Sequence, residues 1–185
     1  MIKEHIGEEV EVPKMVKPVP RLWGDVQALK RLCAVDSPPW RRARAKVTAR
    51  VFYGLGDASG SAFGAAIQQV RDDCIHYEFG QWTEAVTDHE SSNWREFCNL
   101  VEFLEGKAAT GMLDGAEVFM FTDNSTTEAA FWKGTSHSKK LCELVLRLKE
   151  LEMAHGMILH VIHVSGKRMI KSGIDGLSAV TTRLE

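Results

Sequence analysis

The sequence lacks the features of several classes of protein. It contains no run of about 18 consecutive apolar residues, which is the length that a membrane-spanning helix needs. Its start, MIKEHIGEEVEV, has no apolar core of the kind found in a secretory signal. The four cysteines form no Cys-x-x-Cys pair; they are Cys33, Cys74, Cys98 and Cys142. We therefore expect a reduced intracellular chain with no membrane span, no disulfide framework and no zinc knuckle.

An excess of charge of one sign is also missing. Lys and Arg number 23 against 25 for Asp and Glu, which leaves a net charge of −2 over 185 residues. The whole chain is therefore no polycation, and any contact with nucleic acid requires a local basic patch. Apolar residues make up 44% and charged residues 26%, the balance of an ordinary globular protein with one sizeable core.

The first 45 residues differ in pattern from the rest. Residues 1–20 are charged, contain three prolines and have no sustained periodicity, so they are expected to form an extended arm. Residues 21–33 have apolar side chains at helical spacing, which predicts a short amphipathic helix. We predict two parts: an N-terminal arm or linker with a short helix over 1–45, and the main folded domain over 46–185.

From residue 47 the pattern is one of short strands and helices. Strands are predicted over 47–57, 63–70, 74–82, 116–124 and 157–164, and helices over 91–113, 125–134, 138–156 and 173–184. The first three strands have tight connections, as in an antiparallel meander. The fourth is apolar on both faces, as a central strand would be. The order βββ-α-β-α-α-β-α predicts an α+β (α/β) fold, with a five-stranded mixed sheet covered by helices.

Four carboxylates stand at the ends of these elements: Asp57, Glu96, Asp123 and Asp175. If the first and fourth strands are neighbours, Asp57 and Asp123 lie side by side at one edge of the sheet, and the first turns that carry Glu96 and Asp175 face that edge. Clustered carboxylates repel one another unless a cation neutralises them. Oxygen ligands without Cys or His suit Mg²⁺ or Mn²⁺, and two such ions about 4 Å apart form a common apparatus for phosphodiester cleavage.

Each acid alone also has a purely structural interpretation. Asp57, in Gly-Asp-Ala-Ser-Gly, fits a turn. Glu96 fits a capping box with Asn93. Asp123 fits the N-cap of the helix that follows it, and Asp175 complements a helix dipole. The occurrence of all four at element ends, in this order, favours a shared site.

Five segments, in order, resemble one family: GDASGSAFGAAI, SSNWREFCNLVEFL, FTDNSTTEAAF, HVSG and IDGLSA. Over about Ala49 to Ala179 the chain is similar to the ribonuclease H domains of retroelement reverse transcriptases, especially those of DIRS-type and Ty3-type elements. The resemblance implies a ribonuclease H-like fold. It also places the four carboxylates named above on the four metal-binding acids of the family.

The resemblance further implies an activity: metal-dependent hydrolysis of the RNA strand of an RNA–DNA hybrid, giving a 3′-hydroxyl and a 5′-phosphate. The implied cofactors are two Mg²⁺ ions, for which Mn²⁺ can substitute. Asp57 and Asp123 would bridge the metals, Glu96 would contact the first metal and the 2′-hydroxyl side of the substrate, and Asp175 would hold the second metal. His163 falls on the family histidine that assists turnover or product release, with His160 on the same strand as the alternative.

Polar side chains beside the acids are candidates for contacts with substrate: Ser59, Asn93, Asn124, Ser125 and Thr126. Ser92 has an equally good interpretation as a helix cap, and Trp132 is expected in the core. The chain contains no Tyr-x-Asp-Asp polymerase motif. It is therefore expected to be a fragment of a larger polyprotein or a stand-alone relative, with the hybrid and the polymerase part of a parent reverse transcriptase as partners.

Two other functions remain open at this point. One is a catalytically silent module of the same fold that binds nucleic acid or a polymerase. The other is a different nuclease of the superfamily, acting on DNA. We expect the chain in the cytoplasm, or in the nucleus if a parent element replicates there.

Overall fold

The computed structural model describes residues 22–34 and 50–167. The chain divides between Pro38 and Pro39 into two units. In the first unit, the predicted short helix is confirmed as α1 (Leu22–Cys33). None of its residues is buried, and Trp23 is 70% exposed. The predicted arm, the terminal helix and Asp175 lie outside the described residues.

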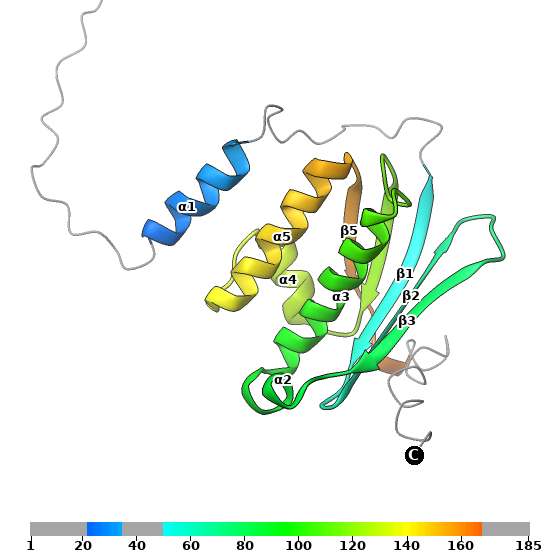
Figure 1. Ribbon diagram of the computed structural model, residues 1–185, viewed down its shortest axis with the longest axis horizontal. Coiled ribbons are helices and arrows are strands. Elements are labelled where there is room, and N and C mark those ends of the chain that lie inside the picture. The colour runs from blue at the N-terminus through cyan, green and yellow to red at the C-terminus, as the bar shows by residue number, and fades with distance from the viewer. Residues whose placement is uncertain (1–21, 35–49, 168–185) are drawn as a thin grey trace, which may run out of the picture. The chain divides into compact units, whose positions relative to one another are not determined.

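The second unit contains the five-stranded mixed sheet that the sequence predicts (Figure 1). Its strands are β1 (Val51–Ala58), β2 (Ala62–Gln69), β3 (Ile75–Gln81), β4 (Glu117–Thr122) and β5 (Ile158–His163). They lie in the order β3-β2-β1-β4-β5. The first three strands form the expected antiparallel meander, and β4 and β5 run parallel to β1. The α+β fold class is thereby confirmed.

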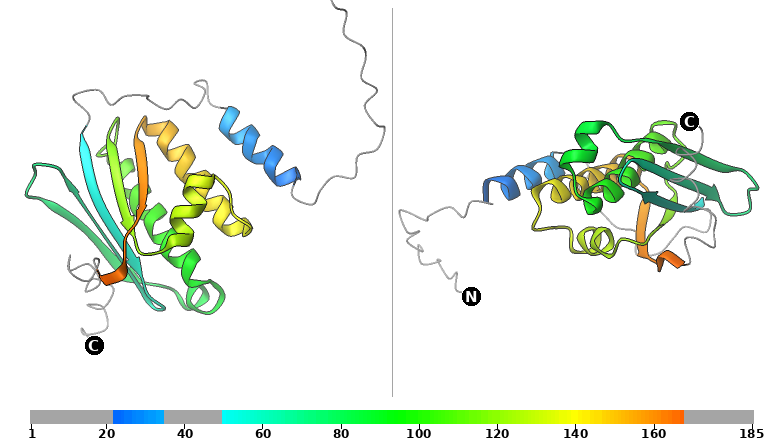
Figure 2. Two further views of the ribbon diagram at one scale, coloured as in Figure 1. Left: turned by 180° about the vertical axis from the view of Figure 1, so that it is seen from behind. Right: turned by 90° about the horizontal axis from the view of Figure 1, so that it is seen from below.

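Helices cover one face of this sheet, as the views in Figure 2 show. The helices of this unit are α2 (Glu84–His89), α3 (Ser92–Ala109), α4 (Ser125–Lys133) and α5 (Lys139–His155). The sequence analysis does not predict α2, because six residues are too few to display a helical period. Gly134 and Gly156 both have positive φ and form the C-caps of α4 and α5, where glycine carries no steric penalty.

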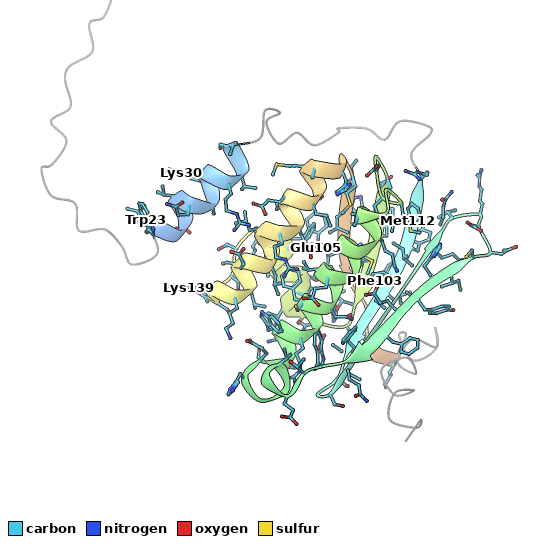
Figure 3. The ribbon with its side chains drawn as sticks, in the orientation of Figure 1. Trp23, Lys30, Phe103, Glu105, Met112 and Lys139 are labelled. Carbon is cyan, nitrogen blue, oxygen red and sulfur yellow. The ribbon has the colours of Figure 1, made fainter. Side chains whose placement is uncertain are left out.

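The core lies between the sheet and the helices. Val118 and Met120 of β4 are fully buried among side chains of the neighbouring strands and of α3, including Phe103 (Figure 3). The predicted central position of β4 is confirmed, because it pairs with β1 on one side and β5 on the other. An ion pair joins two of the covering helices: Arg147 Nε on α5 donates to Glu105 Oε1 on α3 at 2.9 Å. Among the described residues, no helix is long and apolar enough to cross a membrane.

Side chains occupy the free edge of β5, which would otherwise expose unpaired backbone groups. The indole Nε1 of Trp132 donates to the carbonyl oxygen of Val161 at 2.8 Å, and Glu128 accepts from the backbone N–H of His163 at 3.2 Å. Trp132 is 48% exposed. The expectation that it lies in the core is therefore wrong, because its N–H is used at the edge of the sheet.

Candidate active site

The ends of β1 and β4 bring two of the predicted acids to one edge of the sheet. The strands are parallel neighbours, and Leu55 pairs with Phe121. Asp57, two residues beyond Leu55, is half-buried on β1, and Asp123, two residues beyond Phe121, is exposed directly after β4. The expected juxtaposition of the two strand ends is confirmed. Asp57 also lies within β1, rather than in the turn after it.

The third acid, Glu96, is carried by α3. This helix has Ser91 as its N-cap, whose hydroxyl accepts from the backbone N–H of Trp94 at 3.2 Å. Three expectations are therefore wrong: the cap is not Ser92, Asn93 and Glu96 form no capping box, and Glu96 lies beyond the first turn. The cap position depends on backbone dihedral angles, which two adjacent serines do not distinguish.

The environment of Glu96 disfavours its charged form. The pKa of this carboxyl is raised from an ordinary 4.5 to about 7, mainly by burial and further by the charges of Asp123 and Asp57. A hydrogen bond from Asn124 and the charge of Arg95 act in the opposite direction. One carboxyl oxygen, Oε2, is buried without any hydrogen-bond partner among the described residues. Such an unpartnered oxygen, with two carboxylates nearby, fits a site that a cation would complete.

Asn124 connects the end of β4 to the start of α4. Its Oδ1 caps the helix by accepting from the backbone N–H groups of Thr126 at 2.8 Å and Thr127 at 3.1 Å. The N-cap is thus Asn124 and not Asp123, which leaves the Asp123 carboxylate available. The Nδ2 of Asn124 donates to Oδ1 of Asn93 at 2.9 Å, so these two predicted substrate-contact residues lie together.

His163, at the end of β5, also reaches this edge. Its ring Nε2 donates to the backbone carbonyl oxygen of Asp123 at 3.1 Å. Gly166, three residues further along the chain, also lies close to Asp123. A Cβ at this glycine would be 3.2 Å from Oδ2 of Asp123. The alternative histidine, His160, contacts Glu117 at 3.0 Å, near the other end of β4.

The other predicted residues have varied surroundings. The Ser59 hydroxyl closes the turn between β1 and β2 by bonding to both backbone groups of Ala62. Ser125 is exposed at the first position of α4, and Thr126 is half-buried beside it. The sequence analysis misses Asn99, a buried polar residue on α3 that donates to the carbonyl oxygen of Asp57 at 3.0 Å. The sequence feature that could have identified Asn99 is an amide side chain among the apolar residues of that helix.

Three of the four predicted metal ligands lie among the described residues. Asp57, Glu96 and Asp123 offer hard carboxylate oxygens, of the kind that Mg²⁺ and Mn²⁺ prefer. Within residues 22–34 and 50–167, no three His, Cys, Asp or Glu side chains are close enough together to hold an ion. The described carboxylates alone do not make a ready-formed site, and the fourth predicted acid lies outside them.

No protein-family model and no curated sequence matches the chain. Solved structures do. The ribonuclease H1 of the halophilic archaeon Halobacterium salinarum is 18% identical, with a TM-score of 0.54 over 71% of this chain and 95% of the other. The N-terminal RNase H domain of Rv2228c from Mycobacterium tuberculosis is 15% identical, with a TM-score of 0.51 over 71% and 97%. LC11-RNase H1, solved in complex with an RNA/DNA hybrid, is 18% identical, with a TM-score of 0.50 over 69% and 92%. The chain therefore has a ribonuclease H-like fold.

Proposed function

We propose that the chain is a metal-dependent endonuclease that cleaves the RNA strand of an RNA–DNA hybrid. The observation that carries the proposal is the carboxyl of Glu96, which has a pKa raised to about 7 and a buried oxygen without a partner. A partly buried acid with one buried, unpartnered oxygen, beside two further carboxylates, is costly for the fold. This cost is understandable if the three acids serve a bound cation. The fold that the chain shares with ribonucleases H1 gives further support.

Asp57, Glu96 and Asp123, together with Asp175, would hold two Mg²⁺ or Mn²⁺ ions. When bound, such ions activate water and stabilise the leaving oxygen in phosphodiester hydrolysis, which here would leave a 3′-hydroxyl and a 5′-phosphate. Glu96 contributes a carboxylate that the surrounding helix and strands already hold in place. Asp57 and Asp123 contribute carboxylates from two strand ends fixed by the β1–β4 pairing.

The neighbouring polar groups suit an RNA strand. Asn93 is exposed, and an amide of this kind donates to and accepts from 2′-hydroxyls. The buried amide of Asn124 holds the Asn93 side chain in place and hydrogen-bonds to Glu96. Ser59, Ser125 and Thr126 complete the proposed set of contacts with substrate. His163 is exposed next to Asp123, where its imidazole can carry a proton to or from a departing product.

We further propose a setting for this activity. The order and the residues of the five sequence segments support a retroelement reverse transcriptase of DIRS or Ty3 type, in which a polymerase part delivers the hybrid. The enzyme would then act in the cytoplasm, or in the nucleus of a host where the element replicates. Sequencing of the DNA that flanks the coding segment tests this setting, and a reading frame with a Tyr-x-Asp-Asp motif is the expected finding.

The activity is tested by a cleavage assay with labelled RNA–DNA hybrid, single-stranded RNA, duplex RNA and duplex DNA, each with Mg²⁺, Mn²⁺ or EDTA. We expect cleavage of the hybrid alone, stopped by EDTA. Asp123→Asn should abolish cleavage and keep the circular dichroism spectrum of the wild type. Glu117→Gln is the matched control, because it removes an acid at the first residue of β4, whereas Asp123 follows the last residue of that strand.

The possible results separate the candidate functions. Cleavage of duplex DNA instead of hybrid would refute the proposal and show that the chain is a nuclease that acts on DNA. Tight binding of hybrid without cleavage in either metal would indicate a silent module or a domain that requires its polymerase. Cleavage by Asp123→Asn at the wild-type rate would refute the assignment of the site.

A further inference from the structure

Asn99 is a buried polar residue in the helix that carries Glu96. It is 3% exposed, and its neighbours Cys98 and Leu100 are fully buried apolar side chains. Its Nδ2 donates two hydrogen bonds, to the carbonyl oxygen of Asp57 at 3.0 Å and to that of Gly64 at 2.9 Å. A side-chain amide has two N–H hydrogens on this atom, so both are used.

The two acceptors lie opposite each other in the sheet. Asp57 on β1 pairs with Gly64 on β2. The amide of Asn99 therefore fastens α3 across both strands at the position where the Asp57 side chain leaves the backbone. The amide also lies against Gly56 of β1, where a Cβ would be 3.4 Å from the Asn99 nitrogen, an ordinary contact distance.

Asn99 follows Glu96 by three residues. Residues at this spacing lie on the same side of a helix, one turn apart. The side of α3 that presents Glu96 is thus joined by one directional bond to β1, the strand that presents Asp57, and by a second to its neighbour β2. Apolar packing alone is less directional and fixes the rotation and sliding of a helix less tightly.

We infer that Asn99 is a positioning residue that sets the spacing between the carboxylates of Glu96 and Asp57 for a divalent cation. This inference rests on the proposed function, since it assumes that these acids hold a metal. It adds a residue outside the acids and outside the proposed contacts with substrate. Groups that orient metal ligands in this way typically account for about 10- to 100-fold in metal affinity.

The test measures Mn²⁺ affinity directly, by electron paramagnetic resonance on the full chain at fixed pH. Asn99→Ala removes both donors, and Val101→Ala is the matched control, a truncation of a fully buried side chain on the same helix. Both variants should lower the melting temperature. We expect Mn²⁺ affinity to fall at least about tenfold in Asn99→Ala and to stay within about twofold of the wild type in Val101→Ala.

A second variant covers the case in which Asn99→Ala does not fold. Asn99→Ser keeps a polar side chain, but its hydroxyl lies one bond closer to the backbone and does not reach the two carbonyl oxygens, so its Mn²⁺ affinity should fall as in Asn99→Ala. Affinity equal to that of the wild type in either folded variant, with a lowered melting temperature, would make Asn99 merely structural and leave the proposed function intact. A wild-type chain that binds no Mn²⁺ and cuts no hybrid would overturn the proposed function and this inference together.

Discussion

Glu96 links the stability of the fold to pH. The pKa of its carboxyl is about 7 in the folded chain, against an ordinary 4.5. Between these values the folded state binds more protons than the unfolded state, so the contribution of Glu96 is present at low pH and is lost as pH rises through 7. The surroundings of Glu96 therefore favour a protonated or metal-bound carboxyl and disfavour a free carboxylate.

We therefore predict that the metal-free chain is less stable at pH 8 than at pH 5. The contribution from Glu96 is about 1 kcal/mol, which already allows for the solvent that reaches this partly exposed group. Urea unfolding in EDTA across this pH range measures it. Glu96→Gln should have a flatter profile, and identical profiles for the two proteins would contradict the assignment.

Asn124 offers a second test on the scale of a single residue, because it both caps α4 and hydrogen-bonds to Glu96. Asn124→Asp should keep the cap, since both residue types cap well, and should raise the pKa of Glu96 further by adding a like charge. Asn124→Ala should lose the cap, at a cost of about 1 kcal/mol. NMR titration of the Glu96 carboxyl distinguishes the two effects, and an unchanged pKa in Asn124→Asp would exclude the contact.

At the scale of elements, the close approach of β1, β2 and β4 depends on Gly54. A Cβ at this position would clash with the sulfur of Met120 and lie 3.0 Å from the carbonyl oxygen of Ala66. Both neighbours belong to paired strands, so the buried Met120 side chain must change its conformation and the backbone of β2 must move by a few tenths of an ångström. The position of Asp57, three residues further along β1, depends on that pairing.

Gly54→Ala should accordingly destabilise the chain by about 1–3 kcal/mol, the usual range for overpacking. Thermal unfolding measures the loss. Gly60→Ala is the control, because a Cβ there meets nothing within 4 Å, and its melting temperature should stay close to that of the wild type. Equal stability of both variants would show that β1 and β4 tolerate a wider separation.

At the scale of the whole molecule, the core comes from one part of the chain. Among residues 22–34 and 50–167, the buried apolar cluster extends from Phe52 to Val161, whereas α1 buries no residue. We predict that a chain of residues 46–185 unfolds in one cooperative transition, with a melting temperature within about 2 °C of the full chain. Differential scanning calorimetry of the two chains measures this. Loss of the transition would mean that residues 1–45 belong to the folded core.

The sequence alone determined most elements of the fold. Strand and helix periods, polar turns and the glycines after α4 and α5 are local signals, since each acts within a few residues of the chain. The order of strands along the chain, with Asp57 and Asp123 at two strand ends, was also sufficient to predict that these acids reach one edge. Of the described elements, only α2 was not predicted, because its six residues are too few to show a helical period.

The tertiary structure decided what depends on contacts between distant segments. Which of two adjacent polar residues caps a helix is set by backbone angles, so Ser91 and Asn124 were missed in favour of their neighbours. The raised pKa of Glu96 arises from burial by other elements, and the Asn99 amide meets carbonyls 42 and 35 residues earlier in the chain. Such burial and long-range hydrogen bonds leave no periodic pattern in the sequence, because the partners meet only after the sheet has formed.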